Sequence, residues 1–156
     1  MEQLASSKKQ LKLLAVLFVI AAALVQASWA GPDFRTIDTA ELHEMVVDNA
    51  FTREGGREER FTIIDARTKQ EYDQAHIFSA ISVPENDFAG SSRVLPQNKD
   101  ELLVVYCSGA RECETSRKWA NDAAAAGYRN VAIYKEGFQV WKDKKMPVAS
   151  LEKGKQ

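Results

Sequence analysis

The sequence predicts an α/β fold in which a central, mostly parallel sheet carries helices on both faces. Short apolar runs of strand length alternate with segments of helical periodicity, the order that is typical of βαβ units. Three runs, Phe61–Asp65, Leu102–Tyr106 and Val131–Tyr134, are largely apolar, as expected of strands that are buried on both faces of a parallel sheet. Ligands of such sheets bind beyond the carboxyl ends of the strands, so a functional site is expected there.

The chain enters this fold through a strand and a helix. Residues 34–37 are predicted to form the first strand, and Asp38 or Thr39 is placed to cap a helix over residues 40–47. Residues 49–60 are rich in charge and contain two adjacent glycines. We therefore expect an exposed loop before the next strand.

The segment after the strand Phe61–Asp65 is predicted to turn into a short helix. Arg67 and Glu71 stand four residues apart at its start, where an ion pair is expected to hold the turn. Residues 78–83 lead into a short edge strand that Pro84 ends, and residues 85–98 are expected to cover the sheet beside the site.

The second half of the chain repeats the alternation of strand and helix. After the buried strand Leu102–Tyr106, helical periodicity begins at Cys113 and ends at Gly127, a typical C-terminal stop. The strand Val131–Tyr134 and a final short helix over residues 137–141 complete the pattern.

Cys107 stands at the junction between a buried strand and the first turn of a helix. Unpaired backbone N–H groups and the positive end of the helix dipole lie at such a turn, and they lower the pKa of a thiol there. A lone cysteine is more often a packing residue. Here, however, Gly109 allows the amides of the turn to converge and Arg111 adds a positive charge. This pattern favours a nucleophilic thiolate.

Further motifs occur in a fixed order around this loop. They are Asp65-Ala66-Arg67, Glu71-Tyr72, the segment 75–84 with His76, Ala80 and Pro84, then Gly127-Tyr128, the segment 136–141 with Gly137 and Trp141, and Pro147-Val148. With the loop, they resemble the rhodanese (sulfurtransferase) family over residues 34–149. The resemblance implies a single rhodanese-like domain. We place it at residues 31–156, because residues 1–30 have the separate pattern of a leader, described below.

The sequence also departs from the family pattern at several positions. Ala75, Ser79 and Glu136 replace glycines of the family motifs. In the loop, the position five after the cysteine, commonly Arg or Thr, is Glu112, and Arg111 lies one place earlier. The next residue is Cys113, so the loop resembles that of a subgroup of exported or membrane-associated rhodanese-like proteins with two loop cysteines.

The resemblance implies an exported rhodanese-like sulfurtransferase, an enzyme of the thiosulfate sulfurtransferase kind. Cys107 would be the catalytic nucleophile that takes the outer sulfur of a thiosulfate-like donor as a persulfide and passes it to cyanide or a thiol. The substrate-binding residues would be those of the turn: Ser108, Gly109, Ala110, Arg111 and Glu112. The reaction needs neither a metal nor an organic cofactor, and no group of residues has metal-ligand spacing.

Cys113 keeps two other functions open. Two cysteines six residues apart at the start of a helix can approach within disulfide range, which would make Cys113 a redox partner of Cys107 and the protein a thiol–disulfide device. Cys113 can equally be a small buried residue. A non-catalytic module that binds or carries sulfur is the third alternative.

The same residues bear on two other assignments. Phosphatases and arsenate reductases that share this fold need an arginine six positions after the cysteine, where this chain has Cys113. His76 could act as a base for Cys107, but the family resemblance implies a structural role for it. His43 is expected on the polar side of the first helix.

Residues 1–30 have the pattern of a secretory signal peptide. Lys8, Lys9 and Lys12 precede an apolar run, and small residues end at Ala30. The sequence thus predicts a periplasmic or otherwise extracytoplasmic protein, or alternatively one anchored in the membrane by residues 11–27. The expected partners are a small sulfur-containing anion, a thiol or cyanide acceptor and a redox protein. With a formal net charge of −1 and no basic stripe, nucleic acid is not expected.

Overall fold

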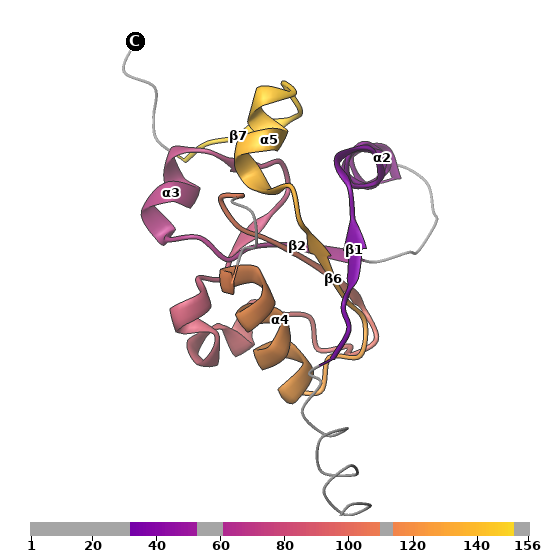
Figure 1. Ribbon diagram of the computed structural model, residues 1–156, viewed down its shortest axis with the longest axis vertical. Coiled ribbons are helices and arrows are strands. Elements are labelled where there is room, and N and C mark those ends of the chain that lie inside the picture. The colour runs from indigo at the N-terminus through magenta and orange to yellow at the C-terminus, as the bar shows by residue number, and fades with distance from the viewer. Residues whose placement is uncertain (1–31, 53–60, 110–113, 152–156) are drawn as a thin grey trace, which may run out of the picture. The chain divides into compact units, whose positions relative to one another are not determined.

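The structure is a computed structural model that describes residues 32–52, 61–109 and 114–151. Within this part of the chain, five strands form one sheet in the order β1-β6-β5-β2-β4, and every neighbouring pair is parallel. The strands are β1 Arg35–Ile37, β2 Phe61–Asp65, β4 Ile81–Ser82, β5 Leu102–Tyr106 and β6 Val131–Tyr134. The expected α/β class is confirmed (Figure 1). By the strand order, β5 lies at the centre of the sheet.

The register of the sheet brings the carboxyl ends of β2 and β5 together. Phe61 pairs with Leu102 and Asp65 pairs with Tyr106, so both strands end level with each other. Just beyond this point the amide of Ala66 donates to the carbonyl of Tyr106 at 3.0 Å. The residues that follow the two strands therefore lie side by side.

Helices cover both faces of the sheet, as expected (Figure 1). They are α2 Thr39–Thr52, α3 Lys69–Gln74, α4 Glu114–Ala125 and α5 Gly137–Asp143, and two 3-10 turns span Glu85–Asp87 and Ala89–Arg93. On one face, Trp119 of α4 packs against alternate residues of β5 such as Leu103 and Val105. On the other face, Leu42 of α2 and Trp141 of α5 pack against Val104, the intervening residue of the same strand. Both tryptophans are fully buried.

Helix α2 is longer than predicted. It continues to Thr52, so the predicted boundary near residue 47 and the predicted loop over residues 49–52 are wrong. No glycine or proline occurs between Thr39 and Gly55, so no helix-breaking residue ends the helix near residue 47. Of the two candidate caps it is Asp38 that acts, because its Oδ1 accepts from the Glu41 amide at 3.0 Å. The rest of the predicted loop lies outside the described residues.

A second, two-stranded sheet joins the middle of the chain to its end. β3 His76–Ile77 pairs in an antiparallel manner with β7 Val148–Ala149. The carbonyl of Pro147 accepts from the Phe78 amide at 3.2 Å and from Nε1 of Trp141 at 2.8 Å. These bonds fix the segment around His76 against α5. None of the helices in the described ranges is both long and apolar enough to cross a bilayer.

Candidate active site

Cys107 follows β5 directly and lines a cavity of about 320 Å³ at the carboxyl end of the sheet. Its side chain is 2% exposed and is disulfide-bonded in this structure. The cavity is lined by Ala66, Arg67, Thr68, Glu71, Pro84, Glu85, Asn86, Cys107, Ser108, Gly109 and Thr115. Of the loop residues singled out from the sequence, Ser108 and Gly109 lie here, whereas residues 110–113, with the second cysteine, lie outside the described residues.

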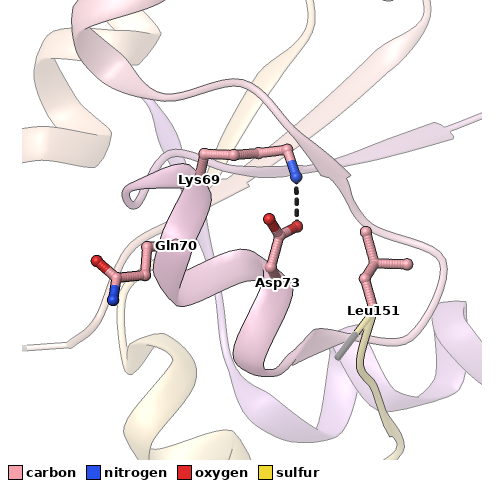
Figure 2. Close-up of a pocket in the computed structure, with 4 residues that line it drawn as sticks. All are labelled: Lys69, Gln70, Asp73 and Leu151. Carbon is pink, nitrogen blue, oxygen red and sulfur yellow. Dashed lines mark hydrogen bonds and ion pairs between the residues drawn. The ribbon is translucent and has the colours of Figure 1, made fainter. Parts of the chain in front are cut away.

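A larger hollow lies elsewhere on the surface and has a different character. It measures about 540 Å³ and is lined by Lys69, Gln70, Asp73 and Leu151 (Figure 2). Lys69 and Asp73 form an ion pair within it. Because none of the four side chains is a nucleophile of the kind that Cys107 provides, we place the chemistry of the molecule in the Cys107 cavity.

The first turn of α5 holds the start of the cysteine loop. The amide of Phe138 donates to the carbonyl of Cys107 at 2.8 Å, and the amide of Gln139 donates to the carbonyl of Ser108 at 3.0 Å. Amides in the first turn of a helix have no partner within the helix, so these carbonyls satisfy them. The loop is thereby fixed by residues 31 positions further along the chain.

Two glycines allow this close approach. Gly109 and Gly137 have φ angles of +89° and +72°, and a Cβ on Gly137 would lie 2.4 Å from the Cα of Gly109. Side chains are strained in this region of φ, and atoms cannot approach so closely. Glycine is therefore required at both positions for the backbone of the loop to contact α5.

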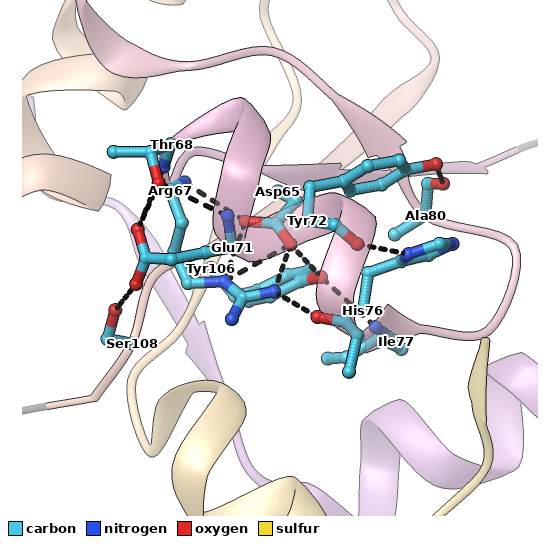
Figure 3. A network of polar contacts seen from close by, with 11 residues as sticks. Asp65, Arg67, Thr68, Glu71, Tyr72, His76, Ile77, Ala80, Tyr106 and Ser108 are labelled. Atoms are coloured by element: carbon cyan, nitrogen blue, oxygen red, sulfur yellow. Dashed lines mark hydrogen bonds and ion pairs between the residues drawn. The ribbon is translucent and has the colours of Figure 1, made fainter. Parts of the chain in front are cut away.

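A buried polar network lies beneath the loop (Figure 3). The hydroxyl of Tyr106 donates to Oδ2 of Asp65 at 2.5 Å and accepts from the amide of Ile77 at 3.1 Å. Burial, and next to it the charge of Asp65, raises the pKa of Tyr106 far above its ordinary value, so the phenol stays protonated. The residue before Cys107 is thus tied to both β2 and β3.

Arg67 extends this network. Its guanidinium bonds to Asp65, with 2.6 Å between Nη2 and Oδ2, donates to the carbonyl of Ala75 at 2.7 Å and stacks 4.0 Å over the ring of Phe138. Burial alone would lower the pKa of Arg67, but the hydrogen bond and charge of Asp65 raise it. The predicted ion pair between Arg67 and Glu71 is therefore wrong: Arg67 precedes α3, and its side chain turns back to the end of β2.

Glu71 instead connects α3 to the loop (Figure 3). Its Oε2 accepts from the amide of Thr68 at 3.1 Å and from the Thr68 hydroxyl at 2.6 Å, and its Oε1 accepts from the Ser108 hydroxyl at 3.1 Å. The first of these bonds, together with the bond that the Glu71 amide donates to the Thr68 hydroxyl at 3.3 Å, forms a capping box at the start of α3. The hydrogen bond from the Thr68 hydroxyl is the main reason why the pKa of Glu71 is lowered, so the carboxylate is charged at neutral pH.

The model of the rhodanese-like domain family matches residues 40–144, which include β2, the cysteine loop and α5. The chain belongs to the rhodanese-like domain family.

Solved structures agree with this assignment of the domain. A rhodanese-like domain from an Anabaena sp. protein, solved by NMR, is 25% identical, with a TM-score of 0.59 over 80% of this chain and 85% of that one. Thiosulfate sulfurtransferase from Pseudomonas aeruginosa is 16% identical, with a TM-score of 0.60 over 75% of this chain and 20% of that one. At this identity the second likeness shows the shared rhodanese fold alone.

Curated relatives match the rhodanese-like domain over a smaller part of their length. A tRNA uridine(34) hydroxylase from Erwinia tasmaniensis is 32% identical over 72 residues, which are 44% of this chain and 20% of that protein. The enzyme of the same name from Enterococcus faecalis is 27% identical over 66% of this chain and 30% of that protein. The chain thus spans less than a third of the length of these relatives.

Some contacts of the rhodanese-like domain were not foreseen from the sequence. The Ser116 hydroxyl, buried in the first turns of α4, donates to Sγ of Cys107 at 3.9 Å, and Glu85 pairs with Lys118 at the cavity wall. The only signal for Ser116 was its spacing from Cys107. Glu85 gave no signal, because its place in the cavity depends on how the 3-10 turn after Pro84 folds onto α4.

The two histidines of the rhodanese-like domain lie apart from the chemistry assigned to Cys107. Nδ1 of His76 is 2.7 Å from the carbonyl of Tyr72, and its ring stacks on the Tyr72 ring with 3.8 Å between centroids. These contacts give His76 a structural role after α3. His43 is half-buried on α2, and its ring centroid lies 6.3 Å from that of Trp141.

Proposed function

We propose that this rhodanese-like protein is a sulfurtransferase that carries sulfane sulfur as a persulfide on Cys107. The observation that supports this most directly is the position of Cys107, which lies at the carboxyl end of the central strand and lines a cavity there. α5 fixes its carbonyl, while α4 begins seven residues later. The positive end of the α4 dipole and the Ser116 hydroxyl both favour a thiolate at Sγ.

The reaction begins once the disulfide of Cys107 has been reduced. The thiolate attacks the outer sulfur of a sulfane donor, the sulfur–sulfur bond of the donor breaks, and the leaving group departs with the electron pair, as sulfite if the donor is thiosulfate. Cys107 is left as an anionic persulfide. Cyanide then attacks the terminal sulfur and leaves as thiocyanate, or a thiolate attacks it and becomes a persulfide. Either acceptor regenerates the Cys107 thiolate.

Intact mass tests this mechanism. The reduced protein is mixed with thiosulfate and then with cyanide, beside the variants Cys107→Ser and Cys113→Ser. We expect a gain of about 32 Da, one sulfur atom, that requires Cys107, is retained in Cys113→Ser and disappears with cyanide. If neither thiosulfate nor any other sulfane donor adds mass to Cys107, the protein is not a sulfurtransferase.

A thiol–disulfide function is the second candidate, because Cys107 is disulfide-bonded in the structure. We propose Cys113, the only other cysteine of the chain, as its partner. In this function the Cys113 thiolate would attack Sγ of the Cys107 persulfide. The bond between Sγ and the terminal sulfur breaks, the terminal sulfur leaves with the electron pair and takes a proton from water to become hydrosulfide, and the Cys107–Cys113 disulfide remains. Titration of the protein in glutathione buffers, with a loss of about 2 Da on oxidation, measures the stability of this bond. If Cys107 never gains sulfur but its disulfide with Cys113 forms readily, the protein is a redox protein.

We further propose that residues 1–30 direct the protein out of the cytoplasm. A disulfide at Cys107 persists in an oxidising compartment outside the cytoplasm. The mass of the protein recovered from bacterial cells shows whether these residues have been removed. Recovery of the uncut chain from the cytosol would overturn this proposal.

A further inference from the structure

We propose that Glu71 is a specificity-determining residue that makes the Cys107 cavity favour sulfane donors of net charge zero or −1 over dianions such as thiosulfate. This inference rests on the proposed sulfurtransferase function and narrows its substrate class. It follows from the balance of charges around the cavity.

Three charged side chains are found among the described residues that line the cavity: Arg67, Glu71 and Glu85. The Arg67 guanidinium is neutralised by Asp65, since the two form several hydrogen bonds and their side chains are 6% and 0% exposed. Glu85 is paired with Lys118. Each of these two pairs is neutral as a whole.

Glu71 is the charge that remains. Its hydrogen bonds come from uncharged groups, the Thr68 amide and hydroxyl and the Ser108 hydroxyl. These bonds hold the carboxylate in place and, with the Thr68 hydroxyl first, lower its pKa. The charge of Arg67 also lowers the pKa of Glu71, as the smallest of the causes, but Arg67 bonds directly to Asp65 and not to Glu71. Because Ser108 follows Cys107, the negative charge lies beside the thiol that must meet the donor.

The size of the effect follows from Coulomb's law. Two unit charges about 8 Å apart in water change a rate or binding constant by about two- to threefold, and a unit charge acting on a dianion changes it by about sixfold. The effect on a dianion is thus the square of the effect on a monoanion. A donor without net charge is unaffected to first order.

Three donors that react in the same way test this relation. They are thiosulfate, with charge −2, methanethiosulfonate, with charge −1, and the zwitterion 2-aminoethanethiosulfonate, with no net charge. In each case the Cys107 thiolate attacks the outer sulfur, and the leaving group is sulfite or a sulfinate. The rate constant for adding one sulfur to the reduced, full-length protein is measured by quenching and intact mass. For each donor it is compared between variant and parent, so that the different reactivities of the donors cancel.

The variant Glu71→Gln removes the charge and keeps a side-chain oxygen for the capping box. We expect it to load thiosulfate about sixfold faster than the parent, methanethiosulfonate about two- to threefold faster and the zwitterion at an unchanged rate. Added salt should speed thiosulfate loading of the parent and reduce the difference between parent and variant.

Two further variants separate charge from local structure. Glu85→Gln leaves Lys118 unpaired and should also favour anionic donors, although Glu85 forms no hydrogen bond to the described part of the loop, Cys107 to Gly109. Glu101→Gln removes an identical charge at the opposite end of β5, where Glu101 accepts from Thr62, roughly 20 Å from Cys107. It should change none of the three rates.

The outcomes distinguish this inference from the proposed function. If none of the three donors loads Cys107, the sulfurtransferase proposal fails. If all three load but Glu71→Gln changes them by one common factor, Glu71 acts by positioning Ser108, and the inference is wrong. Rates that do not change in Glu71→Gln also overturn it, and in both cases the sulfurtransferase function still stands.

Discussion

At the level of single residues, Tyr106 shows how the position of the nucleophile depends on a buried hydroxyl. Its ring belongs to the hydrophobic core beneath α5, while its hydroxyl joins the carboxylate of Asp65 to the amide of Ile77. A hydrogen bond to a buried charged group contributes more to stability than one to a neutral group. Tyr106 therefore links the strand that precedes Cys107 to β2 and to the small second sheet.

The variant Tyr106→Phe tests this link. It leaves the Ile77 amide without its partner and removes one donor from Asp65, so we expect the free energy of unfolding to fall by about 2–3 kcal/mol. Tyr128→Phe is the matched control, because the Tyr128 hydroxyl donates to the neutral carbonyl of Pro96 at 2.9 Å, and its loss should cost about 1 kcal/mol. Urea denaturation followed by circular dichroism measures both. If the free energy of unfolding falls equally in the two variants, the charge of Asp65 does not strengthen the hydrogen bond from Tyr106.

Single residues also show where the sequence was sufficient and where it was not. Cys107 could be placed at the end of a central strand because the apolar run before it is unambiguous. The partner of Arg67 could not be predicted, because the i, i+4 rule holds within a helix and Arg67 lies before the start of α3.

The backbone also explains two positions at which the family pattern has glycine. Ser79 has a φ of +65°, a conformation that favours glycine. Glu136 has a φ of −73°, so glycine is not needed there.

At the level of elements, α5 does more than cover the sheet. The sequence predicted it as a short closing helix, and its bounds are Gly137–Asp143. The amides of Phe138 and Gln139 donate to the carbonyls of Cys107 and Ser108, a contact between residues 31 apart that no local pattern could reveal. In contrast, β2, β5 and β6 were predicted with their observed bounds, because continuous apolar runs leave little choice of boundary. The pairing of loop and helix depends on tertiary approach, which only the folded chain defines.

Replacing Gly137 by alanine tests this role of α5. At Gly137 a methyl group would meet the Cα of Gly109 at 2.4 Å, whereas at Gly127, with a φ of +91°, it would meet nothing within 4 Å. Both variants suffer backbone strain of about 1 kcal/mol, but only Gly137→Ala must also push the cysteine loop away. We expect it to lose about 2 kcal/mol more than Gly127→Ala in thermal or urea unfolding. Equal losses in the two variants would show that α5 does not constrain the loop.

At the level of the whole molecule, the central strands connect two hydrophobic clusters that lie on opposite faces of the sheet. Leu103 and Val105 belong to the cluster beneath α4, and Val104 and Tyr106 belong to the cluster beneath α2 and α5. Neither cluster can separate from β5 without exposing one face of the strand that precedes Cys107. The sheet therefore makes the two faces a single cooperative unit.

Two tryptophans allow this cooperativity to be measured, since Trp119 lies in one cluster and Trp141 in the other. In a Trp29→Phe background, Trp141→Phe leaves a fluorophore beneath α4, and Trp119→Phe leaves one beneath α5. For each variant we expect the urea transition seen by fluorescence to coincide with that seen by far-ultraviolet circular dichroism. Trp119→Phe should be the more stable variant, because Nε1 of Trp119 has no partner in the described part of the chain, whereas Nε1 of Trp141 donates to Pro147. If Trp141 reports unfolding at lower urea than circular dichroism does, the face that holds the cysteine loop opens on its own, and access to Cys107 is then governed by that local opening.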